Sequence, residues 1–138
     1  MPITIRPARP DEQATIKRIV RAARINPMNL DWRRFLVADE DGRIVAIGQV
    51  KPHGDGSREL ASIATIPSHQ RRGMAAQVIR ALIAREQGEL VLVCQATLEP
   101  FYARFGFRRI ARDEMPSYFK RLSWAMRIWN GIAMKRGK

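Results

Sequence analysis

The stretch Gln70-Arg71-Arg72-Gly73-Met74-Ala75 lies between an apolar run at 60–66 and an apolar-periodic run at 75–86. This order predicts a strand, a turn and the start of a helix. The first turn of a helix has unpaired backbone N–H groups at the positive end of the helix dipole. Two arginines and a glycine at that point therefore predict a site for a phosphate group.

The composition is that of a globular domain with a basic surface. Its 138 residues are 46% apolar, so we expect one domain over residues 1–138 with a hydrophobic core. The net charge of +12 favours an anionic partner. We interpret it as a solvated surface around one anionic cofactor, and we do not favour a nucleic-acid partner, which would need stacking aromatics among spread basic groups.

Several features bear on location. No run of about 18 apolar residues is present, so no transmembrane helix is expected. The N-terminal residues lack the apolar core of a signal peptide. Cys94 is the one cysteine, so no disulfide can form within the chain. These features predict a cytoplasmic protein.

Residue patterns predict a meander followed by a crossover. A strand at 3–7 precedes a helix. The helix has Asp11 as its N-cap and ends before Asn26-Pro27. Strands at 34–38, 43–51 and 58–66 follow, joined by short turns, and form an antiparallel meander. The helix at 75–86 leads to a strand at 89–95, which implies a right-handed crossover and a parallel pair.

The remaining elements complete an α+β (mixed α/β) fold. We expect a short helix at 99–105, a strand at 107–111, a helical segment at 116–129 and a last edge strand at 131–135. The central mixed sheet would have about six or seven strands flanked by helices. The edge strand permits a homodimer.

Two segments carry a family resemblance. Residues 66–75, IPSHQRRGMA, resemble the acetyl-CoA signature Q/R-x-x-G-x-G/A of the GNAT superfamily of N-acetyltransferases. Residues 100–107, PFYARFGF, resemble the same family's FY-x-x-x-GF segment. Both motifs occur in the family's order, and the expected element order extends the resemblance over nearly the whole chain. Ala75 stands where many relatives have glycine, which is a mild departure.

The resemblance implies acetyl-CoA as cosubstrate and acetyl transfer to an amine. Backbone N–H groups at 71–75 would bind the pyrophosphate, and a side chain at Gly73 would block its approach. The two arginines would add contacts to phosphate or remain solvated. The strand before the turn would pair with the pantetheine arm, and in the family it splays from the strand at 91–94. The implied cofactor-binding residues are Ile63, Ala64, Thr65, Ile66, Gln70, Arg71, Arg72, Gly73, Met74 and Ala75.

Acetyl transfer requires removal of the amine proton, a donor for the oxyanion and a proton for the CoA thiolate. By resemblance Tyr102 is the general acid that gives a proton to the CoA thiolate. Packing against Phe105 is the alternative function of this side chain. Glu59 is implied as the base, acting through water, with an ion pair to Arg58 or Lys51 as the alternative. His53 and a water chain without a dedicated base remain rival routes for the proton.

Two further residues have structural interpretations. Cys94 is interpreted as a buried apolar residue rather than an acyl carrier, and His69 as structural or solvent-facing. No metal site is expected, because the two histidines and one cysteine lack ligand spacing.

The function we expect is acetyl-CoA-dependent N-acetylation of a primary amine by direct attack in a ternary complex. The acceptor would be a small molecule, a polyamine, a protein N-terminus or a lysine. The alternative is a non-catalytic acyl-CoA-binding or sensing module with an acidic partner. The basic, Trp-rich segment at 116–129 is expected to pack on the sheet or cover the acceptor site. Contact with a membrane surface or partner is the less favoured interpretation, and a pocket lining is a third.

Overall fold

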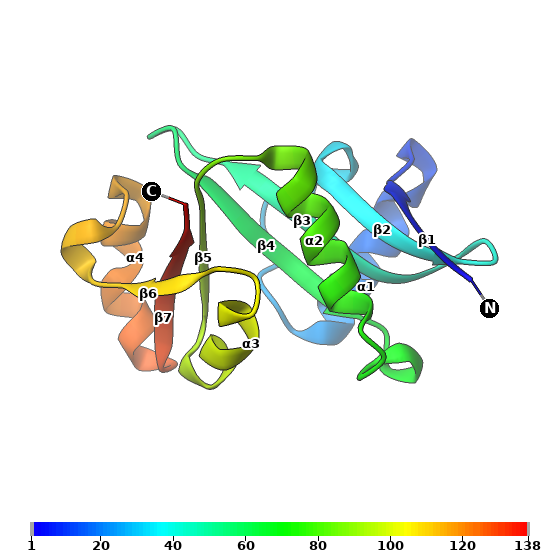
Figure 1. Ribbon diagram of the computed structural model, residues 1–138. Coiled ribbons are helices and arrows are strands. Elements are labelled where there is room, and N and C mark those ends of the chain that lie inside the picture. The colour runs from blue at the N-terminus through cyan, green and yellow to red at the C-terminus, as the bar shows by residue number, and fades with distance from the viewer. Residues whose placement is uncertain (1, 138) are drawn as a thin grey trace. The chain divides into compact units, whose positions relative to one another are not determined.

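The computed structural model describes residues 2–137, which form a mixed sheet with helices on its faces (Figure 1). The strand order is β1-β2-β3-β4-β5-β7-β6. β4 and β5 are parallel, with Glu59 opposite Val91, and β5, β6 and β7 pair antiparallel. The α+β prediction with a meander and a parallel crossover is therefore confirmed.

The strands are β1 (Ile3–Pro7), β2 (Phe35–Glu40), β3 (Arg43–Pro52), β4 (Arg58–Thr65), β5 (Leu90–Gln95), β6 (Arg108–Ile110) and β7 (Gly131–Arg136). The α-helices are α1 (Gln13–Ala23), α2 (Met74–Glu86), α3 (Glu99–Ala103) and α4 (Ser117–Ile128).

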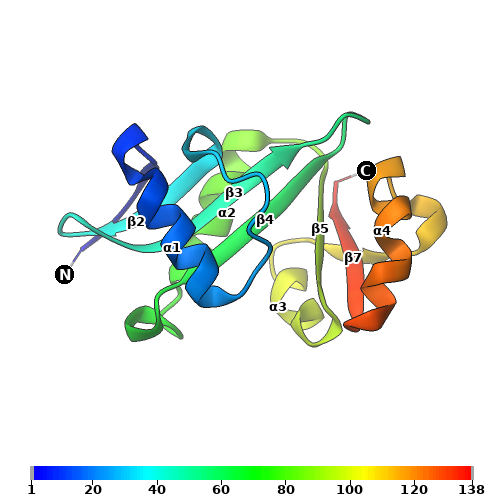
Figure 2. The same cartoon turned by 180° about the vertical axis from the view of Figure 1, so that it is seen from behind.

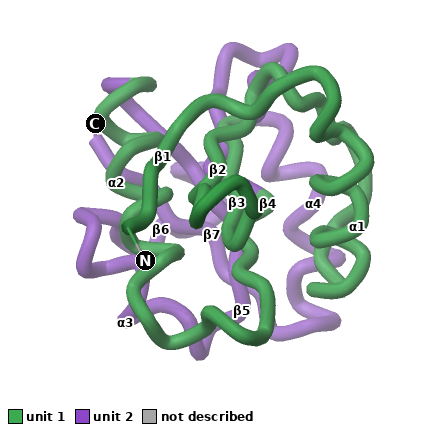
Figure 3. Tube along the Cα trace, turned by 90° about the vertical axis from the view of Figure 1, so that its right-hand side faces the viewer, with its two compact units in different colours: residues 1–50, 62–86 green, residues 51–61, 87–138 purple. Residues whose placement is uncertain are grey.

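The chain divides into two compact units (Figure 3). Unit 1 comprises residues 1–50 and 62–86, and unit 2 comprises residues 51–61 and 87–138. β3 and β4 each contribute residues to both units. The single domain expected over residues 1–138 stays a prediction.

In unit 1, α1 and α2 cover opposite faces of the sheet (Figures 1 and 2). α1 turns Ile16 and Val20 inward, where they pack against apolar side chains of β2 and β3 such as Phe35 and Ile47. On the α2 face, β3 has a glycine. A Cβ at Gly48 would lie 2.6 Å from Ile63 Cδ1, 2.8 Å from Val78 Cγ1 and 3.0 Å from Leu82 Cδ1. The absence of a side chain at this position therefore lets α2 approach the sheet closely.

We expect Gly48→Ala to destabilise the protein by about 1–3 kcal/mol, because the new methyl group overpacks this contact. Urea unfolding measures the change. Gly54→Ala is the matched control, since nothing lies within 4 Å of the added Cβ there. Equal stability of the two variants would contradict the packing argument.

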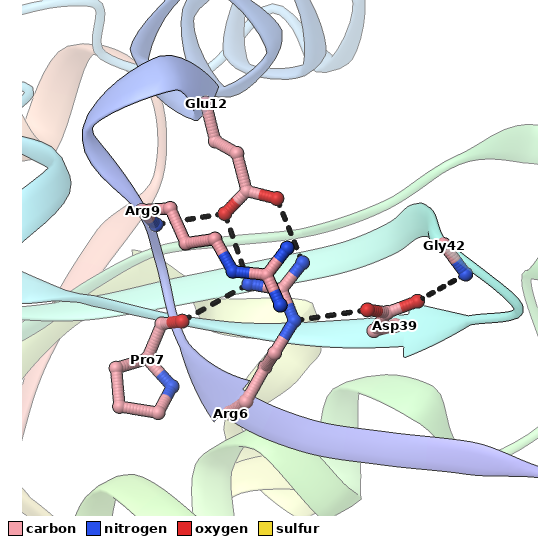
Figure 4. Close-up of polar contacts among 6 residues, drawn as sticks. All are labelled: Arg6, Pro7, Arg9, Glu12, Asp39 and Gly42. Carbon is pink, nitrogen blue, oxygen red and sulfur yellow. Dashed lines mark hydrogen bonds and ion pairs between the residues drawn. The ribbon is translucent and has the colours of Figure 1, made fainter.

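A charged network joins β1 to the start of α1 and to β2 (Figure 4). Arg6 binds Glu12 at 2.7 Å and Asp39 at 2.9 Å. Glu12 also accepts from the backbone N–H of Arg9 at 2.7 Å, and Asp39 accepts from that of Gly42 at 2.7 Å. The hydrogen bond from Arg6 is the main cause that lowers the pKa of each carboxyl group.

Lowered carboxyl pKa values make this network a source of stability at neutral pH that is lost in acid. The contribution is complete above the unfolded-state pKa values of about 4 and disappears as pH falls through the lower folded-state values. We therefore expect Arg6→Met to lower the unfolding free energy most at pH 7, with the difference from wild type narrowing in acid. Denaturant titrations from pH 7 downward measure this. Arg21→Met, at an exposed position of α1, is the control, and a pH-independent difference for Arg6→Met would refute the linkage.

In unit 2, β5 is almost entirely buried, as its apolar sequence predicts. α4 packs Phe119 and Met126 into a core with Val91, Ile110 and Ala133. Figure 2 shows α4 beside β7.

Two expectations are wrong. The strand at 131–135 is not an edge strand, because β7 pairs with β5 on one side and β6 on the other. β7 therefore offers no free edge through which a homodimer could form. Asp11 is not an N-cap either: it lies inside a short 3-10 helix, Pro10–Glu12, which begins after Arg9. Pro10 takes the first helical position because its missing N–H needs no partner there.

Candidate active site

The predicted phosphate turn has the geometry of an anion-binding helix start. Arg71 and Gly73 both have left-handed backbone, with φ of 65° and 79°. Among residues 2–137, no acceptor is found for the backbone N–H groups of 71–76; the first helical bond of this turn runs from Gln77 to the Gly73 carbonyl. Nothing lies within 4 Å of where a Cβ of Gly73 would be. Unpaired N–H groups beside open space fit the pyrophosphate of a CoA molecule.

Buried polar contacts hold this turn in place. His69 Nε2 lies 2.9 Å from Glu40 Oε1, and its Nδ1 lies 2.8 Å from Ser68 Oγ. The hydrogen bond to His69 is the main cause that lowers the pKa of Glu40. His69 is thus structural, one of the two interpretations that the sequence left open. Gln70 donates from Nε2 to the Thr65 carbonyl at 3.1 Å, so its side chain also supports the turn.

The other residues around the turn differ in exposure. The side chains of Arg71 and Arg72 are exposed. Met74 is only 7% exposed, which leaves its backbone as the part that can meet a ligand. Ala75 is half-buried at the second position of α2.

The end of β4 carries the residues that were expected to meet the pantetheine arm. Ala64 is buried, whereas Ile63, Thr65 and Ile66 are half-buried. Within the strand, Ser62 has φ of 59°, which interrupts regular extended structure. Nothing in the sequence marks Ser62, because serine has no pattern that indicates such a break.

Ser62 is held by a buried amide. Gln49 Nε2 donates to Ser62 Oγ at 2.8 Å. Gln49 is 0% exposed, and its buried Oε1 has no hydrogen-bond donor among residues 2–137.

Unit 1 also has a cavity of about 380 Å³ beside α1. None of the turn residues 70–75 lines it. The cavity is therefore separate from the phosphate turn. Its lining is Glu12, Thr15, Arg18, Ile19, Gly42, Arg43, Ile44 and Ile66.

Glu59 and His53, which the sequence presented as rival bases, form a pair in unit 2. Glu59 Oε1 lies 2.8 Å from His53 Nε2, and the two side chains are 17% and 8% exposed. The imidazole stacks on Tyr118 with ring centroids 3.6 Å apart and meets the edge of Phe119. The ring and its hydrogen bond are therefore fixed by α4.

Asp55 lies in the turn between β3 and β4 and links that turn to α4. Its Oδ2 accepts from the backbone N–H of Tyr118 at 2.9 Å, in the first turn of the helix. It also accepts from Ser57, and the hydrogen bond from the Ser57 hydroxyl to Oδ1, followed by that from Tyr118, is the main cause that lowers the pKa of Asp55 to about 2. A carboxylate at this position satisfies an unpaired N–H and the helix dipole together.

Tyr102 lies in α3 with its ring edge against Phe101 and Phe107. Burial is the main cause that raises the pKa of Tyr102 to about 12, so the hydroxyl keeps its proton at neutral pH. Its hydroxyl has no hydrogen-bond partner among residues 2–137. Both expected functions of Tyr102, packing and proton donation, are compatible with this environment.

Cys94 is buried in β5, 4.0 Å from the sulfur of Met134. Burial raises the pKa of its thiol to about 11. A buried protonated thiol is a poor nucleophile, which agrees with its interpretation as an apolar core residue.

Unit 1 thus contains the phosphate turn, and unit 2 contains the Glu59–His53 pair and Tyr102. No cluster of potential metal ligands is found in residues 2–137. Within the same residues, no helix is long and apolar enough to span a membrane.

Solved structures with a similar fold include proteins in complex with CoA. N-acetylglutamate synthase from Neisseria gonorrhoeae, complexed with coenzyme A and N-acetyl-glutamate, superposes with a TM-score of 0.80 at 17% identity. The match covers 99% of this chain but only 35% of the synthase. Rv2747 from Mycobacterium tuberculosis, in complex with CoA, gives 0.78 at 19% identity and covers 98% of this chain and 99% of its own. Ard1 from Thermoplasma volcanium gives 0.73 at 17% identity and covers 99% of this chain and 97% of its own. No curated protein sequence matches the chain.

At these identities the likeness establishes the fold alone. Residues 31–109, more than half of the chain, match the family described as Acetyltransferase (GNAT) domain. The chain therefore belongs to the GNAT acetyltransferases. The family resemblance of its two motifs is confirmed, and acetyl-CoA is the cosubstrate of this acyltransferase family.

The turn geometry leads to a test of CoA binding. We expect Gly73→Ala to weaken CoA binding about tenfold, because a side chain in left-handed backbone costs about 1–2 kcal/mol and disturbs the N–H groups. Calorimetric titration with CoA measures the change. Gly42→Ala is the matched control, since Gly42 has φ of 86° and equally open space but lies in the β2–β3 turn. Equal affinities for the two variants would exclude the turn as the phosphate site.

Proposed function

We propose that this chain transfers the acetyl group of acetyl-CoA to a primary amine by direct attack in a ternary complex. The observation that carries the proposal is the row of unpaired N–H groups at 71–76 in a GNAT acetyltransferase. Both units, residues 1–138, would work as one catalytic domain. The acceptor is a small amine, a polyamine, a protein N-terminus or a lysine.

In this proposal, the backbone of the phosphate turn binds the negatively charged pyrophosphate of CoA. The N–H groups of Arg71 to Ala75 bind the pyrophosphate, and the exposed guanidinium groups of Arg71 and Arg72 add charge-assisted contacts. Gln70 contributes indirectly, because its side chain is bound to Thr65. Residues Ile63 to Ile66 offer their backbone to the pantetheine arm.

Tyr102 is the proposed general acid for the CoA thiolate. A hydroxyl that retains its proton at neutral pH, and that has no partner within the described residues, is available to donate to a developing thiolate. Donation at this point makes CoA a better leaving group.

Glu59 is the proposed proton acceptor for the amine, and His53 is a positioning residue. The imidazole donates from Nε2 to Glu59 Oε1, which orients the carboxylate, while Tyr118 holds the ring. Because both side chains are mostly buried, the carboxylate has a fixed orientation before substrate binds.

Replacement of the tyrosine tests the acid. We expect Tyr102→Phe to lower kcat by about 100-fold, with CoA affinity unchanged, since the substitution removes only the proton donor. Steady-state kinetics with an amine panel and CoA titration provide the two values. An unchanged kcat would mean that Tyr102 has a packing function alone.

Substitutions of the pair separate a base from a positioning residue. We expect Glu59→Gln to abolish the acid limb of the kcat/KM pH profile and to lower the rate by about 100-fold. His53→Ala should also lower the rate, whereas His53→Gln should recover much of it, because an amide N–H can still donate to Glu59.

The pH profiles of these variants provide the decisive comparison. If His53→Gln is as inactive as His53→Ala and both lose the acid limb, His53 itself is the base. If none of the three variants alters the profile, a water chain carries the proton.

The non-catalytic alternative is tested by the same assays. A binding module would take up acetyl-CoA at this turn yet show no acetyl transfer to any amine and no dependence on Tyr102. Transfer that depends on Tyr102 would exclude it.

A further inference from the structure

Helix α4 has two apolar faces, and only one of them is used by the core. Phe119 and Met126 point into unit 2, where they pack against β5, β6 and β7. Four of the six exposed large apolar side chains in residues 2–137 lie in the same helix or at its C-cap. They are Leu122 at 39% exposed, Trp124 at 68%, Ile128 at 77% and Trp129 at 42%.

Two of these side chains share the face of α4 that is turned away from the core. Trp124 and Ile128 are four residues apart and therefore neighbours on the helix, whereas Leu122 projects from another side and the Trp129 ring lies over Gly131. We call Trp124 and Ile128 the Trp124 surface. Isolated exposed apolar side chains are ordinary, but adjoining ones rimmed by charged side chains are typical of an interaction site.

The charge around the Trp124 surface has one sign. α4 carries Lys120, Arg121 and Arg127 and no acidic residue. None of these three cations has a carboxylate partner within residues 2–137. Arg112 is held beside the helix by its bond to Ser123 Oγ at 3.2 Å. The acids closest in sequence are Asp113 and Glu114, and Glu114 is paired with Arg108 at 3.0 Å.

We propose that the Trp124 surface docks on an anionic lipid bilayer. Tryptophan and aliphatic side chains enter the boundary between headgroups and acyl chains, and flanking arginines bind lipid phosphates. A second copy of this chain fits less well, because the unpaired cations of α4 would face one another across a symmetric interface. The proposal is independent of the acetyltransferase reaction, since neither Trp124 nor Ile128 is assigned to it.

Sedimentation with vesicles tests the proposal on the full chain. We expect binding to vesicles of phosphatidylcholine with phosphatidylglycerol, a blue shift of tryptophan emission on binding, and little binding to phosphatidylcholine alone. Raising the salt to about 0.5 M should weaken binding, because the arginines act through screened charge.

Variants assign the binding to the surface. W124A/I128A should reduce vesicle binding about tenfold or more by removing inserted apolar area, and R121A/R127A should reduce it by a similar factor. Leu98→Ala is the matched control, since Leu98 is 43% exposed but lies outside α4. Thermal unfolding and acetyl transfer of each variant verify that the fold is intact.

Three outcomes would overturn the proposal. The first is no binding to anionic vesicles. The second is binding that W124A/I128A leaves unchanged. The third is a dimer, seen by light scattering, that W124A/I128A dissolves while vesicle binding is absent; this result would assign the surface to a second copy.

Discussion

Unit 1 depends on the close packing of α2 against β3. Ile63, Val78 and Leu82 fill the space where a side chain at Gly48 would lie. Close packing fixes the axis of α2, and the axis decides where its first N–H groups point. The phosphate turn is therefore determined from two directions: by the packed body of the helix behind it and by the buried His69–Glu40 hydrogen bond before it.

In unit 2, α4 has the equivalent organising function. It lies between β6 and β7 in sequence, packs on β7, and holds the turn after β3 through Asp55 and Tyr118. The same tyrosine covers the His53 ring. A helix of this kind orders the proposed base pair without contributing a group that reacts, and its opposite face stays available for another partner.

Much of this arrangement follows from the sequence. Apolar periodicity placed every strand and α-helix within a few residues, and Gln70–Ala75 predicted the helix-start turn that the structure contains. Long-range partners could not be predicted in the same way. Glu40 and His69 are 29 residues apart, and no local pattern connects them. His53 and Glu59 are only six residues apart, but the direction of a side chain leaving a turn depends on what packs over it, here Tyr118. β7 was expected at an edge because an apolar strand does not reveal how many neighbours it has.

The interior position of β7 imposes an order on folding. It pairs with β5 and β6, and it is synthesised after both. Until β7 emerges from the ribosome, the apolar face of β5 and the short β6 lack the strand that lies between them. The meander and α2 precede β7 in the sequence. All residues of unit 1 are therefore synthesised while unit 2 still lacks β7. Nascent chains of this protein therefore pass through a stage with a complete unit 1 and an unpaired β5, and transiently exposed apolar strands of this kind are prone to aggregation.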